Sequence, residues 1–140
     1  MKKYFTTSPK QTKSIGKKVA ATLRGGETLA LIGDLGSGKT TFVKGLARGL
    51  SVKNNITSPT FVLFKVYKAN KGKIKQLVHA DCYRVKGQEI LKVGLVEYLH
   101  QPDTIVVIEW ADKLKKFPKQ TIKIFFAYEK TAKERLITIK

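Results

Sequence analysis

Two short runs in the chain are almost entirely apolar. They span residues 28–32 and 104–108, and neither contains a charged side chain. A strand with one face in water alternates apolar and polar residues, whereas a continuous apolar run is typical of a strand covered on both faces. The pattern therefore predicts two strands buried at the centre of a parallel sheet.

Two other stretches have the spacing of amphipathic helices. In the first, Ser8 is placed to cap a helix that begins at Pro9, with Gln11 completing a capping box and residues 25–26, both glycine, ending the helix. Its apolar residues recur at every fourth position: Ile15, Val19 and Leu23. The second helix follows residue 38, with one apolar stripe: Phe42, Val43, Leu46, Ala47 and Leu50.

The apolar period changes from helical to strand-like after residue 60. Residues 61–67 and 74–80 predict a hairpin with a turn at 70–72, so the sheet cannot be wholly parallel. We also expect an edge strand at 2–7, a short helix within 89–99 and a closing hairpin of 122–128 with 136–139. The inward residues of that short helix are predicted to be Ile90, Val93 and Val96.

These elements predict an α/β fold with a single domain over residues 1–140. Its sheet is expected to be mixed but mostly parallel, with an inserted antiparallel hairpin and flanking helices. We expect neither a membrane span nor a signal peptide, because no apolar run is long enough. The single cysteine, Cys82, suits a reducing cytoplasm, and we expect it to be a small buried hydrophobe.

The net charge of +18 is extreme for 140 residues. Such a field attracts polyanions, so RNA, an acidic protein and a nucleotide are all candidate partners. The lysines are nevertheless spread over the whole chain, as a general lysine bias would also produce, whereas a binding footprint concentrates on one face. The charge by itself leaves both interpretations open.

Between the first buried run and the second helix, residues 33–40 read GDLGSGKT, which fits the phosphate-loop pattern G-x-x-x-x-G-K-[ST]. The glycines allow backbone N–H groups to converge on an anion, and the helix that follows adds its positive dipole end. Lys39 is suited to the β- and γ-phosphates of a nucleotide and the Thr40 hydroxyl to Mg²⁺. The order strand, loop, helix is the one that nucleotide binding requires.

Two acidic residues are candidates for the metal and the attacking water. Glu109 directly follows the buried run 104–108, where a carboxylate points into the crevice used by ligands of α/β proteins. Asp81 ends the returning strand of the hairpin and could hold a magnesium-bound water or brace a loop. A solvent-facing strand end for Glu109 and a simple turn cap for Asp81 remain open alternatives.

Other residues near these candidates carry weaker signals. The segment 57–60 lies where nucleotide switches often occur, and the hydroxyl of Thr60 or Ser58 could contact the nucleotide, although a plain turn is the alternative. Trp110 could stack on a base or a partner, or simply pack. His79 and His100 lack the spacing of metal ligands, and we expect both to be structural or solvent-facing. The guanine-reading pattern N-K-x-D is missing, so nothing favours a GTPase.

Four segments together resemble the TsaE family of bacterial ATPases in tRNA threonylcarbamoyladenosine synthesis. They are GDLGSGKTTF at 33–42, TSPTF at 57–61, HADCYR at 79–84 and IEW at 108–110. The resemblance covers nearly the whole chain. The lysine-rich segment 113–119 departs from it and carries no family motif, and no adenine contact is assigned.

The resemblance implies a partner-activated ATPase with ATP and Mg²⁺ as cofactors, a phosphate-loop fold and a cytoplasmic location. Two proteins of TsaD and TsaB type would be its partners, tRNA would be reached through the complex, and hydrolysis would reset that complex between turnovers. The metal would be held by Thr40 and Glu109, with Asp81 and Glu109 catalytic. The nucleotide-binding residues would be Asp34, Leu35, Gly36, Ser37, Gly38, Lys39, Thr40, Thr41 and Thr60.

Two other functions are compatible with a phosphate loop. A small kinase would pass the γ-phosphoryl group to a nucleoside or metabolite, but such kinases usually carry an arginine-bearing lid. Only Arg48 and Arg84 lie away from predicted element ends, and little sequence is left over for a lid. A nucleotide-gated RNA-binding module with negligible turnover is the third hypothesis, and salt-sensitive RNA affinity would favour it.

Overall fold

The computed structural model describes residues 1–59, 63–83, 94–114, 116–131 and 133–140. Its helices are α1 (Pro9–Thr22) and α2 (Lys39–Gly49), with two 3₁₀ turns, η1 (Leu95–Tyr98) and η2 (Ala111–Lys113). Its strands are β1 (Lys2–Thr6), β2 (Thr28–Gly33), β3 (Phe64–Lys71), β4 (Ile74–Asp81), β5 (Thr104–Glu109), β6 (Thr121–Tyr128) and β7 (Arg135–Ile139). Among the residues that the structure describes, no helix is both long enough and apolar enough to span a membrane.

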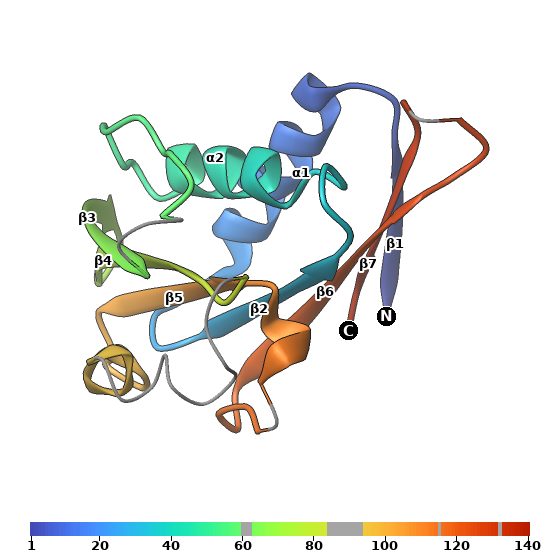
Figure 1. The fold of residues 1–140 in the computed structure, drawn as a ribbon. Helices are drawn as coiled ribbons and strands as arrows, with labels where there is room; N and C mark the ends of the chain where they lie inside the picture. Colours follow the sequence, from blue (N-terminus) through green and yellow to red (C-terminus); the bar gives the residue numbers. More distant parts are fainter. Residues whose placement is uncertain (60–62, 84–93, 115, 132) are drawn as a thin grey trace.

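All seven strands form one sheet in the order β1-β7-β6-β2-β5-β4-β3 (Figure 1). The four central strands β6, β2, β5 and β4 pair in parallel, and the pairings outside them are antiparallel. The mixed sheet predicted from the sequence is therefore confirmed, as are the inserted hairpin β3–β4 and the closing hairpin β6–β7. The two apolar runs are β2 and β5 at the centre of the sheet.

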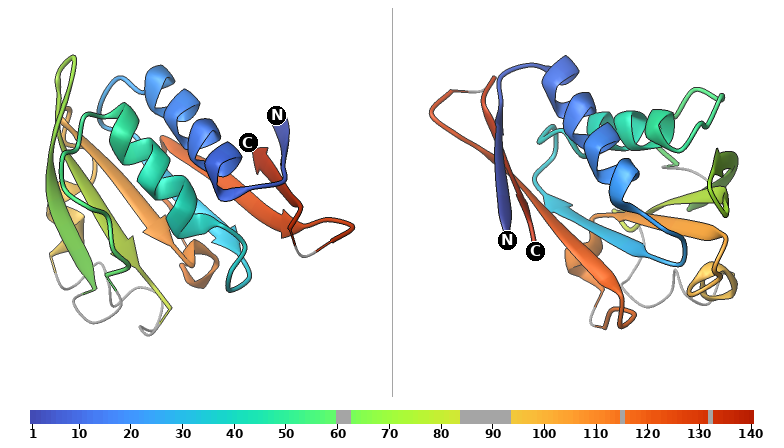
Figure 2. Two further views of the ribbon diagram at one scale, coloured as in Figure 1. Left: turned by 90° about the horizontal axis from the view of Figure 1, so that it is seen from above. Right: turned by 180° about the vertical axis from the view of Figure 1, so that it is seen from behind.

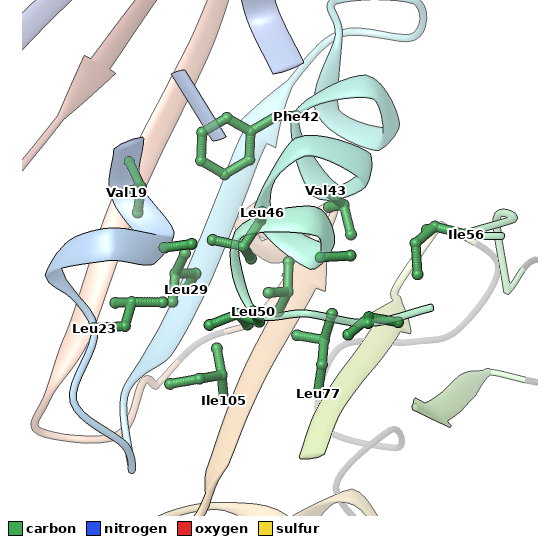
Figure 3. Packing of buried hydrophobic residues seen from close by; sticks show 14 of the residues in the cluster. Val19, Leu23, Leu29, Phe42, Val43, Leu46, Leu50, Ile56, Leu77 and Ile105 are labelled. Atoms are coloured by element: carbon green, nitrogen blue, oxygen red, sulfur yellow. The ribbon is translucent and has the colours of Figure 1, made fainter. Parts of the chain in front are cut away.

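Helices α1 and α2 lie side by side across one face of the sheet (Figure 2). The apolar stripe predicted for α2 is buried at every position, and Ile15, Val19 and Leu23 of the α1 region are buried with it (Figure 3). Phe42 meets Phe126 of β6 edge-to-face, with the ring centroids 5.5 Å apart. This contact fixes the start of α2 against the sheet.

A smaller apolar cluster covers the opposite face. It joins side chains of β2, β4 and β5 to Leu95 of η1, Ala111 of η2 and Leu114. Cys82 is buried in this cluster, as expected from the sequence. Both clusters meet at β2 and β5, which explains why these two strands carry no polar face.

The capping prediction for α1 is confirmed at one end and wrong at the other. Ser8 Oγ accepts a hydrogen bond from the Gln11 N–H at 3.2 Å, while the Gln11 side chain reaches back to the N–H of Thr7 and not to that of Ser8. The helix ends at Thr22, before the glycine pair at 25–26. Lys71 of β3 donates to the backbone carbonyls of Ala21 and Leu23, so a distant side chain takes the place of a glycine cap.

Two other predictions need correction. Strand β3 begins at Phe64 because Leu63 has a left-handed backbone with φ of 63°; residues 61 and 62 of the predicted strand lie outside the described residues. Of the helix predicted within 89–99, residues 89–93 also lie outside them, and the remainder is the short turn η1. There the inward residue is Leu95, whereas Val96 is 56% exposed.

The closeness of α1 and α2 depends on glycine. A Cβ built on Gly45 would lie 2.0 Å from the carbonyl oxygen of Lys13, and one built on Gly16 would lie 2.3 Å from that of Phe42. In both cases the obstructing atom belongs to the backbone of the neighbouring helix, which no side-chain rotation can move. Any side chain at these positions would therefore push the helices apart.

We predict that Gly45→Ala lowers the free energy of unfolding by about 2 kcal/mol, because overpacking of this kind costs more than the roughly 1 kcal/mol that alanine gains in helix propensity. Urea denaturation of both proteins measures the difference. Ser14→Ala is the control, because Ser14 is exposed on α1 and its replacement should be neutral or slightly stabilising. A Gly45→Ala protein as stable as the parent would contradict the backbone contact.

Candidate functional site

The predicted phosphate loop joins the end of β2 to the start of α2. Gly36 and Gly38 have left-handed backbones, with φ of 75° and 103°, so side chains are disfavoured at both. Gly38 is the N-cap of α2 and has no side chain that could accept from the first turn. The N–H groups that open this helix are therefore directed at the loop, as an anion site requires.

Lys39 is the first residue of α2, and its ammonium group closes the loop. Its Nζ donates to the carbonyl oxygens of Gly33 and Asp34, the latter at 2.8 Å, and lies 3.4 Å from the Ser37 hydroxyl. Burial lowers the pKa of Lys39 below 10.5, and the nearby carboxylates, led by that of Glu109, only partly oppose this shift. An anion in the cleft would compensate the desolvated charge better than two carbonyl dipoles do.

The Thr40 hydroxyl faces the carboxylate of Glu109. Thr40 Oγ1 donates to Oε1 and Oε2 of Glu109 at 2.9 and 3.1 Å, across 69 residues of sequence. On its other side, the Glu109 Oε2 accepts from Nε2 of His79, a fully buried side chain of β4. Glu109 is itself only 3% exposed, so the solvent-facing alternative for this carboxylate is wrong.

Asp81 lies beside Glu109 because the two residues are register partners at the ends of β4 and β5. Its Oδ1 accepts from the N–H of Tyr83 at 2.7 Å, which is the turn cap considered above, and its Oδ2 accepts from the Ser58 hydroxyl at 3.3 Å. The carboxylate thus braces the loop that carries Ser58. Thr60 lies outside the described residues.

Trp110 forms the aromatic wall of the site. Its backbone is left-handed, with φ of 57°, a strained conformation for a large side chain and one that is often found at functional sites. Lys39 Nζ lies 4.0 Å from the ring centroid, within cation–π range, and the Tyr83 ring centroid is 4.8 Å away. Trp110 therefore both packs against an apolar cluster and lines the site beside Lys39.

The side chains of Lys39, Thr40, Asp81, Glu109 and Trp110 line one cleft of about 330 Å³ that is open to solvent. Its lining is Leu35, Gly36, Gly38, Lys39, Thr40, Thr41, Ser58, Asp81, Tyr83, Glu109 and Trp110. Among the predicted nucleotide-binding residues whose position is described, Asp34 and Ser37 do not line the cleft. Both instead accept a hydrogen bond from Lys39 Nζ, Asp34 through its carbonyl oxygen and Ser37 through its hydroxyl. The cleft thus brings together residues from four separate parts of the sequence.

His79 is the residue whose position the sequence reasoning missed. It was expected to be structural or solvent-facing; the solvent-facing alternative is wrong, because the side chain is buried against Glu109. The signal was available, because His79 precedes Asp81 by two residues on one strand, and such residues share a face. His100, by contrast, is exposed.

The oxygen atoms in this cleft suit Mg²⁺. The described residues contain no cluster of three or more histidine, cysteine or acidic side chains that would cage a metal. Mg²⁺ needs no such cage, because it usually keeps several waters and is held by one or two carboxylates together with substrate phosphates. The adjacent oxygens of Thr40 and Glu109 provide that kind of donor set.

Comparisons with known proteins agree with this geometry. The family model "Threonylcarbamoyl adenosine biosynthesis protein TsaE" matches residues 6–137. The tRNA threonylcarbamoyladenosine biosynthesis protein TsaE of Bacillus subtilis is 41% identical over 123 residues, or 87% of this chain and 75% of that protein. Its counterpart in Aquifex aeolicus is 40% identical over 126 residues, or 83% of this chain and 92% of that protein.

A solved structure shares the fold as well. The crystal structure of YdiB from Bacillus subtilis superposes with a TM-score of 0.77 at 36% identity, covering 99% of this chain and 83% of that one. The sequence match spans almost every element described above, and it includes all four segments of the sequence on which the resemblance was based. This chain therefore belongs to the TsaE family of nucleotide-binding phosphate-loop proteins.

Proposed function

We propose that this protein binds ATP with Mg²⁺ and hydrolyses it as the ATPase subunit of the bacterial assembly that makes threonylcarbamoyladenosine in tRNA. The observation that carries the proposal is the hydrogen bond from Thr40 to Glu109, because it joins the end of the phosphate loop to a strand-end carboxylate. The names of the relatives support the pathway.

In this proposal Lys39 and the start of α2 bind the phosphates. The ammonium group would exchange its hydrogen bonds to the carbonyls of Gly33 and Asp34 for phosphate oxygens. Because the exchange relieves a poorly solvated cation, it favours binding of a highly charged anion. The Trp110 ring lies within cation–π distance of the same ammonium group.

Thr40 and Glu109 would hold Mg²⁺, which supplies charge neutralisation on the phosphate oxygens when bound. Glu109 has a second task, to accept a hydrogen bond from the attacking water and so orient it toward the γ-phosphate. His79 holds one oxygen of that carboxylate in place. Asp81 positions the loop carrying Ser58, and Thr60 would complete the nucleotide contacts from the segment beyond it.

We further propose that hydrolysis depends on two partner proteins of TsaD and TsaB type, resets the assembly between turnovers and takes place in the cytoplasm. The decisive experiment measures ATP hydrolysis by this protein alone and with both partners, together with modified adenosine in the tRNA. We expect turnover that requires the partners and is coupled to modification. Transfer of the γ-phosphoryl group to an organic acceptor, without any effect of the partners, would support a kinase instead.

Lys39→Ala provides the inactive control for that experiment. Trp110 is the only tryptophan, so its fluorescence reports directly on nucleotide in the cleft. Lys39→Ala should abolish both the nucleotide-dependent change in fluorescence and the turnover. Lys18→Ala removes the same charge from an exposed position on α1 that lines neither this cleft nor a neighbouring one on α2, and should retain both.

Glu109→Gln should lower kcat for ATP hydrolysis about a hundredfold or more while leaving ATP affinity within a few fold, because the amide keeps the shape but loses the charge that orients water and metal. Steady-state kinetics with the partners present and Trp110 fluorescence titrations separate the two effects. Unchanged turnover would assign the catalytic role to Asp81, which Asp81→Asn would then test.

His79→Phe should lower kcat by about tenfold or more with little change in KM, because phenylalanine fills the site but cannot donate to Glu109. His79→Gln retains an N–H donor and should recover most of the activity. Thermal unfolding of both variants serves as the control for folding. If the two variants lose activity equally and in proportion to their stability, His79 is a packing residue and does not position Glu109.

A further inference from the structure

A second cleft lies on the outer side of α2, beyond the phosphate loop. Its volume is about 380 Å³, and its lining residues come from α1, α2 and the loop that follows α2. Three exposed basic side chains line it: Lys13, Lys44 and Arg48. The loop adds the exposed amides of Asn54 and Asn55. We call this the Lys13–Arg48 cleft.

None of these three cations has an ion-pair partner among the residues that the structure describes. The sequence explains why. Neither residues 1–26 nor residues 35–80 contain an aspartate or a glutamate, although the whole chain has 10 acidic residues. Both helices and the loop that form the cleft belong to these two acid-free stretches. The elements that form this cleft therefore carry positive charge with no acidic residue of their own to offset it.

The fold brings these charges together by the same glycines that allow the helices to approach. Gly45 contacts the backbone of Lys13, and Gly49 contacts that of Lys17 and the side chain of Ala20. Lys44 and Arg48 directly precede these glycines, and both line the cleft together with Lys13 of α1. Like charges on neighbouring helix positions destabilise a fold, and no acid offsets them here. Such an arrangement is typical of a surface that meets a polyanion.

The lining favours a phosphodiester backbone over an acidic protein. Protein interfaces are anchored by aromatic and large apolar side chains, but none of the exposed large hydrophobic residues of the described chain lines this cleft. Its apolar floor, Ala47, Val52 and Ile56, is almost completely buried. What remains accessible is a set of cationic and amide donors, which is what phosphate oxygens require. We propose that the Lys13–Arg48 cleft binds the phosphate backbone of RNA.

This site is separate from the nucleotide cleft, and the inference goes beyond the proposed ATPase. The two clefts share no lining residue. They are nevertheless neighbours, because Thr57 borders one and Ser58 the other. An RNA backbone in the second cleft would therefore lie against the loop that Asp81 braces in the first.

The test measures binding of a labelled single-stranded oligouridylate and of an unmodified tRNA transcript by fluorescence anisotropy, between about 50 and 200 mM KCl. The variant Lys13→Gln/Lys44→Gln/Arg48→Gln should bind both RNAs about tenfold more weakly or worse. Losing three phosphate contacts should also reduce the salt slope of log K by about 2. Because the altered residues lie outside the nucleotide cleft, the nucleotide-dependent fluorescence of Trp110 should be retained and shows that the variant is folded.

A matched control removes the same charge elsewhere. The three lysines used for this control are exposed, lie in β6 or directly beside it, and line neither cleft: Lys119, Lys123 and Lys130. Their triple replacement by glutamine should change RNA affinity by no more than about threefold, since only the overall field is reduced. Equal losses in the two triple variants, or no RNA binding at low salt, would overturn the proposal. The proposal would also be overturned if polyglutamate of equal length bound as tightly as RNA and if the Lys13→Gln/Lys44→Gln/Arg48→Gln variant weakened its binding as much.

Discussion

Parallel pairing of β2, β5 and β4 is the constraint on which the site depends. Strands that run in the same direction present their carboxyl ends at one edge of the sheet. In this protein those ends are Gly33, Glu109 and Asp81, and the register places Asp81 opposite Glu109. The hairpin β3–β4 keeps β4 parallel to β5 although it adds an antiparallel strand outside it. The phosphate loop and both acids therefore lie close together in the fold although they are far apart in the sequence.

Grouping charges at a covered sheet edge carries a desolvation cost that the surrounding contacts must offset. Glu109 is held by hydrogen bonds from Thr40 and His79, and Lys39 by carbonyls of its own loop. These partners hydrogen-bond the charged groups, but burial still lowers the pKa of Lys39. A site in this state is suited to gain stability from an anion and a divalent cation that arrive together.

Helix α2 serves two surfaces at once. Its first turn faces the phosphate loop, and its later turns face the Lys13–Arg48 cleft. The inner stripe of the helix is fixed by the apolar core and by glycine contacts with α1, so it cannot shift independently of the sheet. The segment between residues 52 and 58 borders both clefts and is attached to the carboxyl edge of the parallel strands through Ser58 and Asp81. Adjacent residues of this segment, Thr57 and Ser58, therefore border the two clefts.

The sequence by itself determined most of what depends on local spacing. The buried strands follow from uninterrupted apolar runs, and the apolar stripe of α2 follows from its helical period. The phosphate loop follows from its glycines, because the left-handed backbone angles of such a loop favour glycine. Glu109 and Asp81 were identified because strand ends are readable from the same pattern. Tertiary structure alone decided what depends on distant partners: Lys71 of β3 ends α1, Leu95 and not Val96 faces inward, and His79 contacts Glu109. It also brought Lys13, Lys44 and Arg48, which come from two helices, to the lining of one cleft. A period in the sequence shows which face of an element is apolar, but the neighbour that the face will meet is set only when the sheet order and the packing of the helices are fixed.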